Sequence, residues 1–293
     1  MSNGSFWTPQ QWAQFNGVAG DKTQPGLLRI TAGPMEVAQH VFPTIVTGND
    51  NSFPADTIDV NTGTPSTGVT RSFATLEKPF TLSKVHIDDP ALTMASNQVT
   101  LAGQALALVE DSLFFLGRDA RLPAGAQRVA LPPGDQAKLD RGLLGIAEAN
   151  RVVPVSAGRK KTYGLATYRA VVKGIAQFTD DQQGPPYALI LSPDTFADAN
   201  LPLEDDAMVT PASAIQALLM SGPFVTSPGL PNRTGLLASL GGKTTTLYIG
   251  TGPLVEYDTH DGSTYSFTAR ESIQFLNIDS RSLIKLDFEE IAP

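Results

Sequence analysis

The sequence predicts an α+β fold, in which helices and strands occupy separate stretches of the chain. Apolar residues recur at close to helical spacing from Asp88 to Gly117, which predicts one unusually long helix. From Gly235 onward, β-branched and aromatic residues alternate with polar turns, which predicts a strand-dense region. Between these regions, two helical patterns flank a short apolar run at 185–193. Such segregation of helices from strands is typical of the α+β class.

A short helix is predicted near the N-terminus. Thr8 is a favoured N-cap residue and Pro9 suits the first helical position, so the segment 9–20 is expected to be helical. Trp12 and Phe15 lie three residues apart and therefore share one face of this helix. The expected product is an amphipathic helix with an aromatic face.

A long polar arm is expected next. The segment 48–68 is rich in Asn, Asp, Ser, Thr, Pro and Gly and has few large apolar residues, a composition typical of a projecting loop. Such an arm has too few apolar side chains to bury itself. The segment 70–87 that follows it is rich in Thr, Phe, Leu and Val and is expected to form a strand.

The long helix has recognisable start and stop signals. Asp88 or Asp89 is expected to cap it and Pro90 to open it, whereas Gly117 is expected to end it. A helix of about 27 residues would be about 40 Å long, at 1.5 Å per residue. That length predicts a spine for the fold.

The middle of the chain is predicted to alternate helices with one strand. The segment 118–158 reads as loop-rich, with a break at 132–134 and a short helix within 138–149. Thr210 and Pro211 are suited to the N-cap and first position of a helix. The expected order is a helix at 163–178, a buried strand at 185–193 and a helix at 210–222.

The last part of the chain is predicted to contain two hairpins. In the first, the strand LLASL turns at Gly241 and Gly242 into the strand TTTLYIG. In the second, PLVEYD turns at 259–263 into a long aromatic-rich strand, and a final strand SLIKLDF follows.

Composition excludes several classes of function. The 293-residue chain has a formal net charge of −8, which opposes broad attachment to nucleic-acid phosphates or anionic membranes. It has no cysteine, so disulfides, thiolate catalysis and cysteine-ligated metals are excluded. No membrane-spanning segment and no secretory signal are expected, which predicts a cytoplasmic location.

Catalytic motifs are absent from the sequence. The three histidines, at 40, 86 and 260, form no HxxxH or HxH pair, and His260 is expected to lie in a hairpin turn. Neither GxSxG nor GxGxxG occurs. Asp88 with Asp89 fits a helix cap, and Glu110 with Asp111 fits a helix end that meets neighbouring groups. We therefore expect no enzyme activity and no catalytic, metal or cofactor site.

Several segments together resemble the encapsulins, the bacterial nanocompartment shell proteins with the capsid fold of phage HK97, once described as linocin-type bacteriocins. The start SFWTPQQWAQF is similar to the family's N-terminal helix, and FTLS followed by the helix ending EDSLFFLG is similar to its strand and spine helix. GPPYALILSPDTF is similar to its Gly-Pro-Tyr strand. LYIGTGPLVEYD and YSFTARESIQFLNIDSRSLIKL are similar to its closing hairpins.

The resemblance implies a division of the chain into parts. The tract 118–159 lacks wording typical of the family, and the arm reads as a variable loop. The implied parts are an N-terminal helix and arm of the P-domain at 1–43, an extended E-loop at 44–79, the P-domain with its spine helix at 80–139, an A-domain at 140–242 and the closing P-domain hairpins at 243–293.

A pore loop is implied by the position of the family's A-domain at the fivefold axis. The matching segment is 197–211, and Glu204, Asp205 and Asp206 lie at its centre. Fivefold repetition of these carboxylates would attract cations and repel anions. The alternative is that the three acidic residues form an ordinary solvated loop.

A cargo site is implied on the inner surface. In encapsulins a short C-terminal peptide of the cargo enzyme docks against the N-terminal helix and nearby strands, as apolar pockets suit an extended peptide. The alternative is that these side chains belong to the core. The positions that match are Trp12, Phe15, Leu254, Val255 and Tyr257.

The resemblance implies a self-assembling shell that encloses a cargo enzyme and limits exchange through pores. Closed icosahedral symmetry would assemble roughly 60 or more identical copies. Deletion of the segment 49–67 is expected to abolish assembly, and intact shells in electron micrographs would refute this. The alternatives are a phage or prophage major capsid protein that holds DNA, and a hydrolase or bacteriocin.

Overall fold

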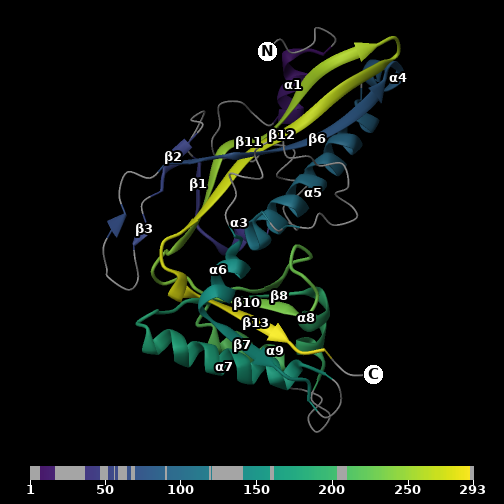
Figure 1. Cartoon of the computed structure of the whole chain (residues 1–293). Coiled ribbons are helices and arrows are strands. Elements are labelled where there is room, and N and C mark those ends of the chain that lie inside the picture. The colour runs from purple at the N-terminus through teal and green to yellow at the C-terminus, as the bar shows by residue number, and fades with distance from the viewer. Residues whose placement is uncertain are drawn as a thin grey trace.

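The structure, a computed structural model of the chain, has an elongated upper body and a lower body joined end to end (Figure 1). The upper body contains a four-stranded sheet, and the lower body contains a five-stranded sheet covered by helices. The predicted α+β class is confirmed. The structure describes residues 7–16, 37–46, 52–55, 57–58, 65–66, 70–89, 91–118, 120, 141–158, 162–202 and 210–290.

A long β-hairpin is the centre of the upper body. Its two strands pair antiparallel up to Asp261 and Thr264, so a turn is present where predicted but is shorter than 259–263. One further strand pairs antiparallel with the second hairpin strand, and a short strand pairs parallel with the first. The order is β1-β11-β12-β6, where the strands are β1 (Thr44–Val46), β11 (Thr245–Asp261), β12 (Thr264–Asn277) and β6 (Ala74–Ser83).

The spine helix α5 (Thr93–Leu116) has 24 residues and packs against β6 and β12. It begins three residues later than the predicted start at Pro90, because Leu92 adopts a left-handed conformation at the N-cap position. The carboxylate of Asp89 nevertheless accepts a hydrogen bond from Thr93 N at 3.1 Å. Asp89 therefore satisfies a backbone donor of the first helical turn, although Leu92 occupies the N-cap position. The predicted end at Gly117 is confirmed.

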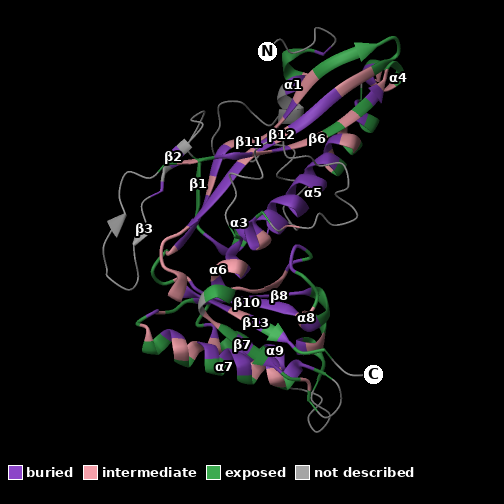
Figure 2. Ribbon diagram, viewed as in Figure 1, coloured by how far each residue is buried: buried purple, intermediate pink, exposed green. Residues whose placement is uncertain are grey.

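Burial identifies α5 as a core helix. By length and composition it is the single helix among the described residues that is apolar enough to cross a membrane. However, 78% of its most apolar 18-residue window is buried inside the protein. Figure 2 shows this burial over most of its length. The hydropathy of α5 is therefore explained by packing.

The strand predicted at 70–87 is divided in the structure. β5 (Thr70–Ser72) belongs to a small separate sheet, β6 follows it, and the last residues form a short helix, α4 (Lys84–Asp88). The end of the predicted strand is therefore wrong. Lys84 N donates a hydrogen bond to Ser263 O at 2.7 Å, which joins the start of α4 to the hairpin turn.

The lower body is a five-stranded sheet that contains the completely buried strand β8 (Tyr187–Leu191). Every residue of β8 is buried, which confirms the buried strand predicted at 185–193. β8 pairs antiparallel with β10 (Thr234–Ser239) and parallel with β9 (Phe224–Thr226). The other side of β10 pairs with β13 (Leu283–Phe288), and β13 pairs with β7 (Val152–Val155).

The first predicted hairpin is wrong. β10 and β11, the strands on either side of Gly241 and Gly242, belong to different sheets. The turn between them therefore connects the lower body to the upper body. A close approach explains one glycine, because a Cβ at Gly241 would lie 2.5 Å from Pro185 O.

The helices of the lower body follow the predicted order. α6 (Leu143–Asn150) and α7 (Gly164–Asp180) confirm the helices predicted within 138–149 and at 163–178. α8 (Pro193–Asn200) is an additional helix that directly follows the buried strand. α9 (Pro211–Leu218) confirms the helix predicted at 210–222, although it is shorter.

The N-cap of α9 supports a specific prediction for stability. Thr210 Oγ1 accepts a hydrogen bond from Ser213 N at 3.3 Å, and Pro211 occupies the first helical position. Replacing Thr210 with Ala is expected to lower the free energy of unfolding by about 1 kcal/mol, because this N–H loses its acceptor. Urea unfolding would measure the change. Thr210→Ser keeps the hydroxyl and should remain close to the original stability, whereas equal losses in both variants would contradict the cap.

The described part of the arm is not wholly exposed. Phe53 in β2 (Ser52–Pro54) is 2% exposed and stacks on Tyr248, with ring centroids 4.0 Å apart. It also contacts Phe73, so this part of the arm is anchored on its own chain. The expectation that the arm does not bury itself is wrong for this residue. The remaining described strands of the arm are β3 (Thr57–Ile58) and β4 (Pro65–Ser66).

Candidate functional site

An aromatic cluster lies where the N-terminal helix α1 (Pro9–Asn16) meets the hairpin. Phe267 is its centre and is completely buried. The ring of Trp7 stacks on Phe267 at a centroid distance of 5.3 Å, and Trp12 lies 6.3 Å from the same ring. Phe80 and Tyr257 contact it from β6 and β11, at 5.4 and 5.8 Å. The cluster therefore fixes α1 on the sheet.

The start of α1 forms a reciprocal cap. Thr8 Oγ1 accepts a hydrogen bond from Gln11 N at 3.3 Å, and Gln11 Oε1 accepts one from Thr8 N at 2.8 Å. This capping box satisfies two backbone donors at the helix end. The predicted roles of Thr8 and Pro9 are confirmed, although α1 ends at Asn16 and is shorter than predicted.

The predicted cargo-binding residues differ in exposure. Trp12 is 4% exposed and Val255 is 2% exposed, so both side chains lie beneath the surface. Leu254 and Tyr257 are partly exposed on β11. Phe15 lies in α1, but its side chain is outside the described residues. The cargo site stays a prediction, in which the part-exposed Tyr257 lies over the same cluster as the buried Trp12 and Val255. Leu254 lies on the other face of β11, because side chains alternate along a strand.

The hairpin end carries the exposed His260. Its Nδ1 lies 2.9 Å from the hydroxyl oxygen of Tyr257, and its ring stacks on Tyr265 at a centroid distance of 5.5 Å. The sequence predicts His260 in the hairpin turn, but the structure places it in β11, paired with Tyr265 just before the turn. Within the described ranges, no three His, Asp or Glu side chains are grouped so that they could hold a metal ion.

The predicted pore residues Glu204, Asp205 and Asp206 lie outside the described residues. The described chain stops at residue 202 after α8 and resumes at Thr210, the cap of α9. The acidic segment therefore connects two helices of the lower body. Its function as a pore loop stays a prediction.

Two buried carboxylates near the end of α5 join the two bodies. Asp111 accepts hydrogen bonds from Val37 N and Ala38 N, at 3.1 and 2.8 Å, at the start of the helix α3 (Val37–Val41). It also accepts one from Ser227 Oγ in the lower body, at 3.1 Å. Glu110 accepts two from Gln39 Nε2, at 2.7 and 2.9 Å. The acidic pair thus contacts neighbouring groups, as expected, and all of these partners belong to its own chain.

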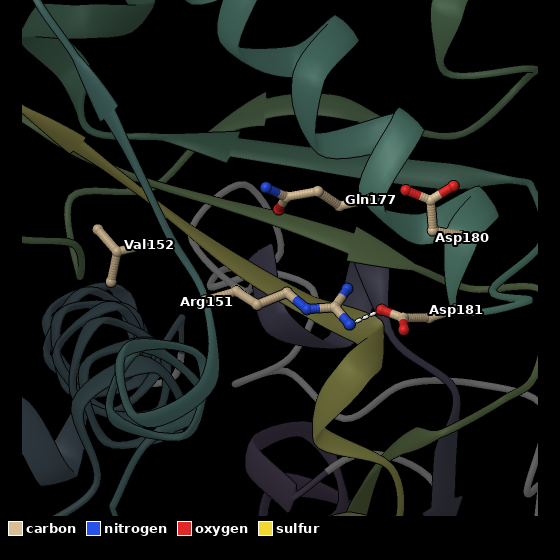
Figure 3. Close-up of a pocket in the computed structure, with 5 residues that line it drawn as sticks. All are labelled: Arg151, Val152, Gln177, Asp180 and Asp181. Carbon is tan, nitrogen blue, oxygen red and sulfur yellow. Dashed lines mark ion pairs between the residues drawn. The ribbon is translucent and has the colours of Figure 1, made fainter.

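The surface of the lower body has a shallow pocket of about 380 Å³. Its lining comes from the last turns of α7 and from the start of β7 (Figure 3). Arg151 forms an ion pair with Asp181 across the pocket and donates a second hydrogen bond to Arg281 O at 3.3 Å. Burial lowers the pKa of Arg151, and the positive charge of Arg281 lowers it further. The pocket was not predicted from the sequence, because α7 and β7 meet through tertiary packing.

A neighbouring ion pair makes stability depend on pH. Arg281 Nη2 donates to Asp279 Oδ2 at 2.8 Å, and Gln183 Nε2 donates to the same oxygen at 2.9 Å. Burial alone would raise the pKa of Asp279, but the bonds from Arg281 and Gln183 outweigh it and hold the pKa below 3.8. The stabilisation should be fully present above the unfolded pKa of about 3.9 and be lost as pH falls through the lower folded value.

The titration of Asp279 would test this linkage. In Arg281→Ala the folded pKa of Asp279 should rise, because its main hydrogen-bond donor is removed. The variant should therefore lose less stability than the original protein when pH is lowered from 5 to 3, roughly the range where carboxylates titrate. Carboxyl-resonance NMR and unfolding at each pH would measure both effects. An unchanged pKa in the variant would contradict the assignment.

Comparison with solved structures identifies the fold. The fold matches a virus-like particle from Pyrococcus furiosus with a TM-score of 0.64 and 13% identity, covering 89% of this chain and 96% of that one. It also matches the holo-SrpI encapsulin complex from Synechococcus elongatus, with a TM-score of 0.57 and 11% identity over 93% and 95% of the chains. The capsid of Myoviridae phage XM1 matches with a TM-score of 0.55 and 14% identity over 91% and 94%. The chain has the HK97-type capsid fold.

A protein-family comparison matches part of the sequence. The family described as "Encapsulating protein for peroxidase" matches residues 138–274. The resemblance to the encapsulins is therefore confirmed. None of the curated proteins matches the sequence.

Proposed function

We propose that this chain is the shell subunit of an encapsulin nanocompartment. The observation that carries the proposal is the family match over residues 138–274, combined with a capsid fold that extends over about nine tenths of the chain. The structural alignment with the encapsulin complex covers 93% of this chain. A shell acts by enclosing its contents, so its function requires assembly and no catalytic group. Identical copies related by closed symmetry would form the wall.

The same proposal assigns the parts of the chain. The upper body, with the spine helix and the long hairpin, corresponds to the P-domain, and the lower body corresponds to the A-domain. β13 is an exception to the expected closing segment at 243–293, because this strand pairs with β10 in the lower sheet. The arm at 44–79 corresponds to the E-loop, and deletion of 49–67 remains the variant expected to abolish assembly.

The contents of the shell are proposed to be a cargo enzyme with a short C-terminal targeting peptide. The part-exposed Tyr257, which packs on the aromatic cluster, supports a docking surface for an extended apolar peptide. The acidic segment around Asp205 is proposed to select cations at a pore. We further propose a cytoplasmic location and no specific nucleic-acid partner, which the net charge of −8 supports.

A phage-type capsid that holds DNA is the second candidate, and the match to the phage XM1 capsid favours it. The contents of particles purified from the native host separate the two. After nuclease treatment, encapsulin particles should yield a co-purified enzyme and no protected DNA. Protected DNA without an enzyme would favour the capsid function.

Residue variants test the docking surface. Tyr257→Ser should reduce co-purified cargo while shells remain intact. The matched control is Tyr168→Ser on α7, a part-exposed tyrosine of the lower body. Equal cargo content in all three shells would refute docking at this surface.

A further inference from the structure

The turn of the long hairpin contains a reactive pair of residues that the shell function does not use. Asp261 ends β11 and Gly262 follows it, and this is the single Asp-Gly pair in the 293-residue chain. Both residues are exposed, and Asp261 pairs with Thr264 across the turn. The turn therefore consists of Gly262 and Ser263, and glycine is favoured at the first position of such a turn.

The backbone nitrogen of Gly262 is open to approach. The φ angle of Gly262 is 56°, and a Cβ at this position would have no heavy atom within 4 Å apart from the two chain neighbours. Glycine also has no side chain that could shield its nitrogen. The carboxylate of Asp261 forms no ion pair or hydrogen bond with any residue that the structure describes. A free carboxyl group therefore lies next to an unshielded amide nitrogen.

Asp258, on the same strand, differs from Asp261 in both respects. Its carboxylate accepts a hydrogen bond from Thr268 Oγ1 at 2.6 Å, so the carboxyl group is held in place. The next residue is Thr259, whose stiff β-branched side chain crowds the backbone nitrogen. Asp258 is exposed like Asp261, so exposure does not distinguish them. Asp258 is therefore an internal control within the hairpin.

We propose that Asp261 converts spontaneously to isoaspartate through a cyclic imide. The nitrogen of Gly262 bonds to Cγ of Asp261, and the hydroxyl of the protonated carboxyl group leaves with the amide proton as water. The chain holds the two groups together, which favours reaction within one molecule. Because Asp261 belongs to an extended strand, the ring closes when the hairpin end opens, and such local opening is frequent at the ends of elements.

Hydrolysis of the imide gives aspartate or isoaspartate. Water adds to one ring carbonyl and breaks the bond from that carbon to nitrogen, so the water released on ring closure is taken up again. Opening at Cγ restores aspartate, whereas opening at the main-chain carbonyl leaves the chain running through Cβ and Cγ. The backbone then contains an extra methylene group. Lys84 N donates a hydrogen bond to Ser263 O at 2.7 Å, and the longer turn should release this bond between α4 and the hairpin.

Incubation of the full-length protein at neutral pH in heavy-oxygen water tests the proposal. Mass spectrometry of peptide fragments distinguishes isoaspartate from aspartate and locates the oxygen label. The isoaspartate fraction and the label should rise with time at Asp261, whereas both should stay at background at Asp258. Asp261→Glu keeps the charge but cannot close a five-membered ring on this nitrogen, so the variant should remain unmodified at this position.

The isomerised protein, separated by ion exchange, tests the structural consequence. Amide hydrogen exchange at Lys84 should become faster than in the original protein, because its acceptor has moved. Exchange at Val109, which is completely buried in α5, should stay the same. Unchanged exchange at Lys84 would overturn the release of α4.

Two results would overturn the modification itself. One is equal labelling of Asp261 and Asp258. The other is a folded protein without isoaspartate at Asp261 after a period in which the chain unfolded in guanidinium chloride forms it. Neither result depends on whether the chain assembles, so the proposed shell function is tested separately.

Discussion

Replacing Phe267 with Ala is expected to lower the free energy of unfolding by about 3–5 kcal/mol, the usual range for a large aromatic residue in a core. The ring is completely buried and contacts the rings of Trp7, Trp12 and Phe80. Its loss leaves a cavity under α1. Because these two tryptophans are the only ones in the 293-residue chain, their fluorescence should shift to longer wavelength in the folded variant as water reaches them.

A second core phenylalanine provides the control. Phe178 in the lower body is also completely buried and stacks on Tyr187, at a centroid distance of 5.6 Å. Phe178→Ala should lose a similar amount of stability but leave the tryptophan emission of the folded protein unchanged. Equal emission shifts in both variants, or no shift in Phe267→Ala, would contradict the position of α1 on the hairpin.

Replacing Asp111 with Ala is expected to cost about 3–5 kcal/mol of unfolding free energy. Asp111 is completely buried and accepts bonds from Val37 N, Ala38 N and Ser227 Oγ. Each donor left without an acceptor costs about 1–3 kcal/mol. The loss should also loosen the connection between the bodies, because α3 and the segment at Ser227 are both attached through this one carboxylate.

Amide hydrogen exchange and chemical unfolding would measure both effects. In Asp111→Ala, protection should fall at Val37 and Ala38 more than in the buried strand β8. Asp111→Asn retains one oxygen acceptor and should lose less stability than the Ala variant. Asp261→Ala at the hairpin end should change stability by about 0.5 kcal/mol or less. Unchanged exchange at Val37 and Ala38 in Asp111→Ala would contradict the junction.

Caps, apolar runs and turn residues in the sequence predict those helices and strands whose formation depends on residues close together in the chain. Thr8 and Thr210 each precede a proline, and both form side-chain caps in the structure. The apolar run at 185–193 predicts the buried strand β8, and the turn at 259–263 predicts the long hairpin. These features depend on residues a few positions apart, so chain order alone contains the information.

The errors arise where distant segments decide the outcome. The strands around Gly241 and Gly242 have the pattern of a hairpin, but β10 pairs with the distant strands β8 and β13, and β11 pairs with β12 across the next turn. The start of α5 was misplaced because Leu92 adopts a left-handed conformation, which such a residue rarely favours. The burial of Phe53 requires Tyr248 from the hairpin. None of these contacts leaves a periodic signal.

The candidate site was predictable in part for the same reason. The pattern on α1 predicts an aromatic face, and Trp12 does contact the hairpin. It does not reveal that Trp12 becomes 4% exposed, because that burial depends on Phe267. The pocket beside Gln177 combines an α7 residue with Arg151 from another element, so sequence spacing alone does not identify it.

Sedimentation velocity of the purified full-length chain, with electron micrographs of the same sample, tests shell formation most directly. Closed assembly of roughly 60 or more copies should give one hollow species with a mass on the order of 2 MDa or more. A well-folded species near the subunit mass of 31.1 kDa, with no hollow particles at micromolar concentration, would contradict the proposal that this chain builds a shell.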